Sequence, residues 1–114
     1  MQHHMHLHEK PFERVRTGRQ TIETRLFDEK RQMLNLGDTI VFSKRGKPPE
    51  TIDTEIVGLL RYRTFRELIE DIPPTLYGYP SDFNKDVAAG LMRTYYPEED
   101  ERKYGVLGIK IKLI

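Results

Sequence analysis

The stretch TGRQTIETRLFDEKR, residues 17–31, has the two-residue period of a β-strand and carries an acid and a base at alternate positions. Ile22 and Leu26 share one face, so Glu23 and Arg25 share the other, with their Cα atoms about 7 Å apart. If exposed, this ion pair would add only about 0–1 kcal/mol to stability. An arginine can clamp a phosphate or stack on a base, and a carboxylate can accept a hydrogen bond from an exocyclic amine. We therefore predict that the pair serves a ligand.

The residues before this stretch predict a strand followed by a short helix. In residues 1–10, Met5 and Leu7 alternate with histidines, which is typical of a strand. Pro11 suits the first position of a helix of about two turns, and Gly18 suits the turn that ends it. After the quoted stretch, a Gly-Asp turn precedes a compact apolar strand over residues 39–42.

The second half of the chain alternates strands with helices. A proline-containing loop over residues 45–53 leads into a long strand over residues 52–62. Thr64 and Glu67 form a capping box, which predicts a helix that ends before Pro73. A second helix is expected over about residues 85–96, and its buried face is expected to carry Val87, Ala88, Leu91, Met92 and Tyr95. A short acidic turn or helix follows it. The chain then ends in a strand whose alternating apolar residues are Ile109, Ile111 and Leu113.

These elements predict a mixed α+β fold in which residues 1–114 form one domain. Five or six short strands in a chain of this length favour a small curved sheet or β-barrel with flanking helices.

The composition excludes several classes of protein. The chain is 37% hydrophobic and 32% charged, which is typical of a globular protein with a polar surface. It has no cysteine, so no disulfide-linked partner is expected, and no apolar run or leader pattern predicts a membrane segment or export. We expect a cytoplasmic protein. A net charge of +1 argues against a generally basic nucleic-acid binder, although residues 10–31 hold seven Lys or Arg against four acids.

Three segments resemble a known family: PF..V..GRQTIETRLFDEKRQMLNLGDTIVF, LLRYRTFREL and YY.EEDERKYGVLGIKIKLI. Together they resemble a bacterial ASCH-domain protein of the PUA-like superfamily, whose G-x-K-x-x-E-x-R signature is matched by Gly18, Glu23 and Arg25. Gln20 stands where the signature has lysine. The resemblance implies a PUA-like β-barrel, a cleft between the first helix and the barrel, and a role in binding RNA.

One branch of this family hydrolyses the acetyl group of N4-acetylcytidine with a lysine and a threonine of the signature. Those positions are Gln20 and Glu23 here, and the further glutamate expected near Ser81 and Asp82 is missing. The resemblance therefore does not extend to this activity, because the base and the nucleophile are both replaced.

We predict that the chain binds RNA, a nucleotide or a modified nucleoside. Tyr96, which precedes Pro97, is expected to line the cleft, whereas Tyr95 is expected in the core. His4, His6 and His8 have no partner motif, so we predict no metal and no other cofactor. The predicted ligand-binding residues are Gly18, Arg19, Gln20, Thr21, Glu23, Arg25, Lys30, Arg31 and Tyr96.

Two other functions remain open on the sequence. A metal-independent hydrolase or nuclease could act on RNA or a modified nucleoside in the same cleft, with Glu23 as base and Arg25 or Lys30 facing the phosphate. Alternatively, the acidic segment PEEDE, residues 97–101, could form a protein-interaction surface.

Overall fold

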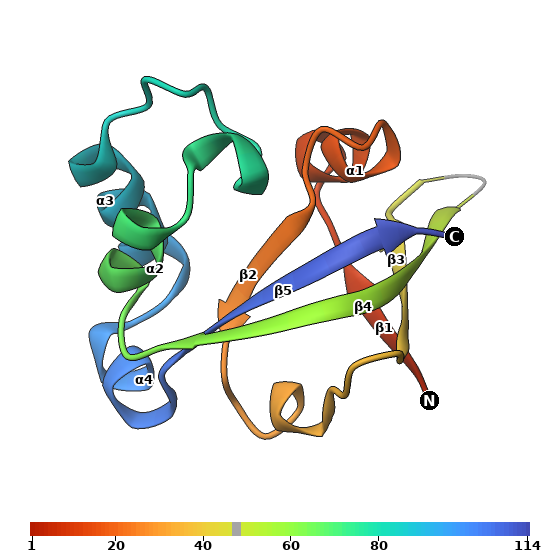
Figure 1. The fold of residues 1–114 in the computed structure, drawn as a ribbon, viewed down its shortest axis with the longest axis horizontal. Coiled ribbons are helices and arrows are strands. Elements are labelled where there is room, and N and C mark those ends of the chain that lie inside the picture. The colour runs from red at the N-terminus through yellow and green to blue at the C-terminus, as the bar shows by residue number, and fades with distance from the viewer. Residues whose placement is uncertain (47–48) are drawn as a thin grey trace.

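A computed structural model describes residues 1–46 and 49–114 as a curled half-barrel of strands with the three later α-helices packed on one side (Figure 1). The described part of the chain contains five strands, which confirms the predicted mixed α+β fold. They are β1 (Gln2–His6), β2 (Ile22–Leu26), β3 (Thr39–Lys44), β4 (Glu50–Tyr62) and β5 (Val106–Leu113).

The strands form a single sheet in the order β1-β3-β4-β5-β2. β1 runs parallel to β3, and the other three pairs are antiparallel. β1 and β2 are the two edges of this sheet, and helix α1 (Glu9–Arg16) lies between them along the chain. The curl brings the two edges together at one point, where the Arg25 guanidinium on β2 donates to the His6 carbonyl on β1 at 3.0 Å.

The long strand β4 supplies much of the curvature. Its pairing with β5 is irregular between Ile56 and Gly58, and a bulge of this kind bends a strand and increases its twist. β4 begins at Glu50, inside the segment expected to be a loop, because Glu50 and Thr51 continue the antiparallel pairing with β3. Residues 47 and 48 of that loop lie outside the described residues.

Apolar residues form two buried clusters. The first fills the inside of the curled sheet and includes Met5, Phe12, Ile40 and Phe42. The second lies between the sheet and the helices, and includes Ile22, Leu26, Phe65, Leu68 and Ile69. Strand β2 is therefore covered on both faces, since Ile22 and Leu26 contact the second cluster and Glu23 projects from the opposite face.

The helices largely follow their local signals. Thr64 caps α2 (Phe65–Asp71), since its hydroxyl accepts a hydrogen bond from the Glu67 amide at 3.0 Å as predicted. α1 begins at Glu9, two residues before the predicted Pro11. The remaining helices are the short 3-10 helices η1 (Arg31–Met33) and η2 (Pro74–Tyr77), and the α-helices α3 (Lys85–Tyr95) and α4 (Glu98–Tyr104).

The predicted core face of α3 is partly wrong. Ala88 is buried and Met92 packs against the second cluster, but Val87, Leu91 and Tyr95 are exposed. Val87, Leu91 and Tyr95 follow one another at intervals of four residues, so they form their own stripe on the helix, turned away from the core.

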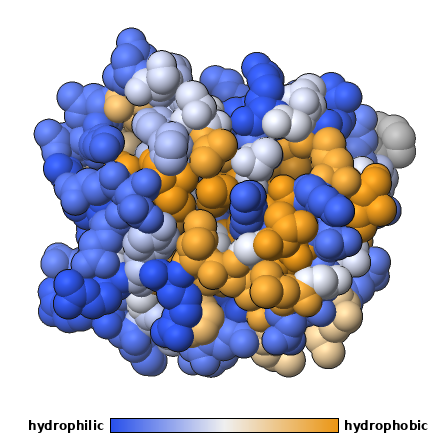
Figure 2. Space-filling view, viewed as in Figure 1, coloured by the Kyte–Doolittle hydropathy of each residue, from blue (hydrophilic) through white to orange (hydrophobic). Residues whose placement is uncertain are grey.

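Apolar and polar residues are unevenly distributed over the surface. In the view of Figure 2, apolar side chains gather where β4 and β5 cross the face, while the left side, where α2, α3 and α4 lie, is mostly hydrophilic. Leu60 on β4 and Leu113 on β5 are 37% and 45% exposed. None of the helices in the described ranges is both long and apolar enough to span a membrane.

Candidate functional site

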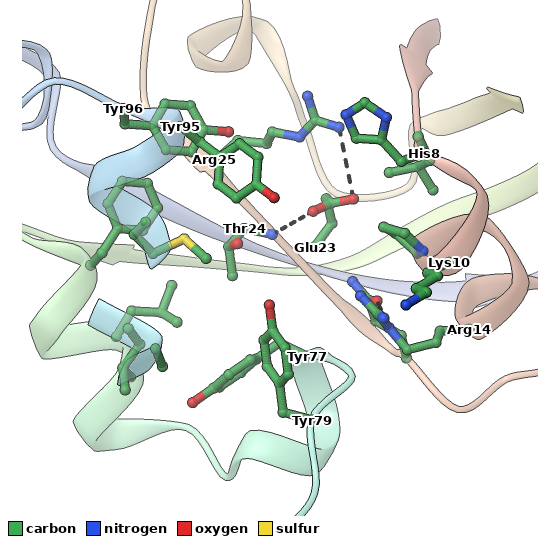
Figure 3. A pocket seen from close by; sticks show the side chains of 18 of the residues that line it. His8, Lys10, Arg14, Glu23, Thr24, Arg25, Tyr77, Tyr79, Tyr95 and Tyr96 are labelled. Atoms are coloured by element: carbon green, nitrogen blue, oxygen red, sulfur yellow. Dashed lines mark hydrogen bonds and ion pairs between the residues drawn. The ribbon is translucent and has the colours of Figure 1, made fainter. Parts of the chain in front are cut away.

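A cavity of about 640 Å³ opens beside the edge strand β2. Its lining comes from the β1–α1 turn, from α1, from β2 and from the helical side of the molecule between α2 and α3. Figure 3 shows Glu23 near the centre, with Tyr95 and Tyr96 on one side, Tyr77 and Tyr79 on another, and His8, Lys10 and Arg14 on the third. Strand, aromatic and cationic side chains therefore converge on one carboxylate.

The Glu23 carboxylate is buried yet incompletely hydrogen-bonded. The residue is only 8% exposed. Oε1 accepts from the backbone amide of Thr24 at 3.0 Å, whereas Oε2 is buried without a hydrogen-bond partner among the described residues. Buried polar atoms are nearly always bonded, and leaving one unpaired costs about 1–3 kcal/mol. This oxygen and the hydroxyl of Tyr77 are the two buried side-chain polar atoms of the cavity lining that have no hydrogen-bond partner among the described residues.

Burial raises the pKa of the Glu23 carboxyl above its ordinary value, because desolvation disfavours the charged form. Arg25, the Thr24 amide and, more weakly, Arg14 and Arg31 act in the opposite direction. Desolvation exceeds their combined effect, so the surroundings of Glu23 destabilise its negative charge relative to water.

Arg25 lies beside the Glu23 carboxylate and is held in place by β1. Its Nη2 lies 3.8 Å from Glu23 Oε2, which is too long for a hydrogen bond, and donates instead to the His6 carbonyl. The two side chains do share one face of β2, as the sequence predicts. They are, however, largely buried rather than exposed, with side-chain exposures of 19% and 10% for Arg25 and Glu23.

The signature glutamine is fixed by its neighbours. Gln20 Oε1 accepts from Arg14 Nε at 3.1 Å, and Gln20 Nε2 donates to the Ile22 carbonyl at 3.0 Å. Gly78 makes room for this pair, since a Cβ at that position would overlap Arg14 Nε and lie 2.9 Å from Gln20 Oε1. Gly78 also has a φ of 99°, which favours glycine. Both ends of the Gln20 amide are therefore already engaged.

Aromatic rings form two groups around the cavity. Tyr79 stacks on Phe83 with centroids 4.4 Å apart and meets Tyr77 edge-on at 5.8 Å. On the other side, Tyr96 stacks on Phe65 at 5.0 Å. Burial raises the pKa of Tyr96, so its hydroxyl stays neutral and able to donate at ordinary pH. Such rings offer surfaces on which a planar ligand can stack.

The structure brings only some of the predicted residues to the cavity. Gln20, Glu23, Arg25 and Tyr96 line it. The other five predicted residues lie outside its lining. Gly18 forms the turn after α1 with a φ of 79°, Arg19 is exposed and donates to the Thr17 hydroxyl, and the Thr21 backbone bonds those of Leu76 and Ile111. Lys30 is exposed, and Arg31 forms an ion pair with Asp28.

Several lining residues were not predicted from the sequence. Lys10 and Arg14 on α1, His8 before it and Thr24 on β2 all line the cavity, as do Tyr77 and Tyr79 from the connector after α2. Tyr95 lines it too and is 63% exposed, so its assignment to the core is wrong. Of these residues, only Lys10 and Arg14 have a signal in the sequence, since their four-residue spacing places both on one face of a helix.

Among residues 1–46 and 49–114, no group of three or more His, Asp or Glu side chains is arranged to hold a metal ion. Two of the N-terminal histidines bond other side chains: His3 bonds Asp38 at 2.8 Å, and His6 bonds the Ser43 hydroxyl at 2.8 Å.

The curled five-stranded sheet with its flanking helices is that of a small PUA-like barrel. The chain matches the ASCH domain family over residues 5–114, and it belongs to that family.

Two solved structures resemble the whole chain. The match to the crystal structure of hypothetical protein PH0355 has 32% sequence identity, covers 100% of both chains and has a TM-score of 0.86. The solution NMR structure of protein PF0455 from Pyrococcus furiosus is 31% identical, covers 100% of this chain and 98% of its own, and has a TM-score of 0.78. The comparisons do not support the expectation of a bacterial source, since Pyrococcus furiosus is an archaeon. No curated protein matches the chain.

Proposed function

We propose that this ASCH domain binds a nucleotide, either free or as part of an RNA, with the base inside the cavity beside β2. The unpartnered Oε2 of Glu23 carries the proposal. A buried acceptor of this kind is satisfied when a ligand brings an N–H donor to it, and the desolvation cost is then offset in the complex rather than in the free protein.

A purely structural role for the Glu23–Arg25 pair accounts less well for the geometry. A structural ion pair in a buried position needs direct hydrogen bonds to offset desolvation. Here the Arg25 Nη2 and Glu23 Oε2 atoms are 3.8 Å apart, so no direct hydrogen bond joins them. The raised pKa of Glu23 likewise means that its desolvation is not fully offset. A ligand inserted against both groups would supply the missing contacts.

The remaining walls suit the other parts of a nucleotide. The tyrosine groups on two sides offer stacking surfaces for a base, which are worth about 1–3 kcal/mol per stacked base. Lys10 and Arg14 on α1 supply positive charge on the third side, where a phosphate would be attracted. This distribution supports a ligand with a planar, hydrogen-bonding part and an anionic part.

Lys10 allows a clean test because it is exposed and makes no side-chain hydrogen bond or ion pair with the described residues. Nucleoside monophosphates and short RNAs would be titrated by calorimetry and by thermal shift. Lys10→Met should weaken phosphate-bearing ligands about 5–10-fold and reduce the salt dependence of RNA binding, whose slope is about −0.7 per phosphate contact. Lys85→Met on α3, outside the cavity lining, is the control. Failure of every nucleotide and RNA to bind would refute the proposal.

The second candidate is metal-independent hydrolysis of RNA or a modified nucleoside in the same cavity. The raised pKa of Glu23 favours it, because a general base works best when its pKa is near the operating pH. N4-acetylcytidine is not the expected substrate, since the Gln20 amide is engaged at both ends and is not a base. Turnover of RNA that is lost in Glu23→Gln would favour catalysis over binding alone.

A further inference from the structure

Glu23 and Arg25 together present an ordered set of hydrogen-bonding groups to the cavity. An ionised carboxylate has acceptor sites on both oxygens, and of these only one on Glu23 Oε1 is used, by the Thr24 amide. A guanidinium has five N–H donors, and the described contacts of Arg25 use one of them, to the His6 carbonyl. Along one edge of the cavity, the pair therefore presents a donor from Arg25, followed by two adjacent acceptors, the oxygens of Glu23.

The neighbouring side chains of Gln20 and Arg14 do not compete for this role. The Gln20 amide is already bonded through its oxygen to Arg14 and through its nitrogen to the Ile22 carbonyl. Arg14 is in turn held between Gln20 and the ring of Tyr79, 5.7 Å from its centroid. Along β2, the pattern offered to a base is thus set by Glu23 and Arg25, while the Tyr77 hydroxyl, also buried without a partner among the described residues, could bond another part of the ligand.

From this arrangement we infer that the cavity selects guanine. The Watson–Crick edge of guanine presents O6 as an acceptor, followed by N1–H and N2–H₂ as donors. Arg25 would donate to O6, and the two oxygens of Glu23 would accept from N1–H and N2–H₂, as cytosine does in a base pair. The inference rests on the proposed function and specifies the ligand of the same site.

The other bases fit the pair less well. Adenine and cytosine place a ring nitrogen lone pair beside their amine, so one carboxylate oxygen would face an acceptor. Uracil has one N–H between two carbonyl groups, which again meet a carboxylate oxygen. A site that leaves buried polar groups unpaired with the wrong ligand discriminates strongly against it.

The test compares 5′-monophosphates by calorimetry on the wild-type chain. GMP should bind at least about 10-fold more tightly than AMP, CMP and UMP. IMP, which lacks the N2 amine, should bind about 5–20-fold more weakly than GMP, and N1-methyl-GMP should show no measurable binding because its methyl group replaces the central donor. These comparisons change the ligand and not the protein, so they do not depend on the folding of a variant.

Glu23→Gln provides the complementary test, since an amide offers one donor and one acceptor in place of two acceptors. The variant should bind GMP no more tightly than AMP or CMP, while Glu99→Gln on the exposed start of α4 keeps the wild-type preference. Four monophosphates bound within threefold of one another, or a base other than guanine bound most tightly, would overturn the guanine inference and leave the nucleotide site intact. Absence of binding by every nucleotide would overturn both.

Discussion

Replacing Glu23 by glutamine should make the protein more stable at neutral pH while weakening its ligand binding. The carboxylate is buried, Oε2 has no partner among the described residues, and burial raises its pKa despite the nearby Arg25. Glutamine keeps an oxygen for the Thr24 amide and removes the charge. An unsatisfied buried group costs about 1–3 kcal/mol. We expect a gain of about 1 kcal/mol, at the lower end because Arg25 already offsets part of the cost.

The gain should depend on pH in a defined direction. The folded-state pKa of Glu23 lies above the ordinary value of 4.5, so the folded state holds this proton more tightly than the unfolded state. Wild-type stability due to Glu23 is therefore greatest below about pH 4.5 and falls as pH rises through the raised folded-state pKa. Glutamine does not titrate, so the advantage of the variant should be near zero in acid and full above that pKa.

Urea unfolding followed by circular dichroism, from about pH 4 to about pH 8, measures this difference directly. A gain of about 1 kcal/mol corresponds to a rise of about 4 °C in Tm for a chain of this size. Glu99→Gln, an exposed substitution of the same chemistry, should change stability by less than about 0.5 kcal/mol at each pH. A Glu23→Gln protein that is less stable than wild type at about pH 8, or a difference that does not vary with pH, would refute the account of Glu23 as a strained, ligand-directed carboxylate.

Three further predictions concern the same cavity. Arg25→Met should cost about 2–3 kcal/mol of stability and also weaken nucleotide binding, because it removes the hydrogen bond to His6 and leaves Glu23 without its nearest cation. Urea unfolding measures the stability and calorimetry measures the binding. The control, Arg45→Met, should change neither. Gly78→Ala should lower Tm and ligand affinity together, because its Cβ would displace Arg14; an unchanged Tm would contradict the close approach. Guanosine binding, measured without a phosphate, should weaken as pH falls through the raised pKa of Glu23, and this weakening should be lost in Glu23→Gln. The charged and titratable groups around this carboxyl are Arg25 on β2, Glu9, Lys10 and Arg14 on α1, Arg31 on η1, Tyr77 on η2 and Tyr79 after it, Tyr95 and Tyr96 at the end of α3, His6 on β1 and His8 after it.

Features that depend on neighbours in the chain could be predicted from the sequence. The two-residue period of residues 21–26 correctly places Ile22 and Leu26 in the core, with Glu23 and Arg25 side by side on the opposite face. The Thr64 cap is likewise a contact between residues three apart, and its chemistry suffices to predict it. Alternation and turn residues also predicted the strands, because backbone geometry fixes which residues share a face.

What only the tertiary structure decided is which environment each of these side chains meets. No local rule says that the Glu23 oxygen would be buried without a partner, because its burial comes from α1 and from the helices that follow β4, which are distant in sequence. Tyr95 has the same spacing on its helix as a core residue, and only the docking of α3 leaves it exposed beside the cavity. Desolvation depends on every atom packed around a group, so the pKa of Glu23 and the chemistry of the site arise from the assembled fold, whereas the sequence alone supplied the pair itself.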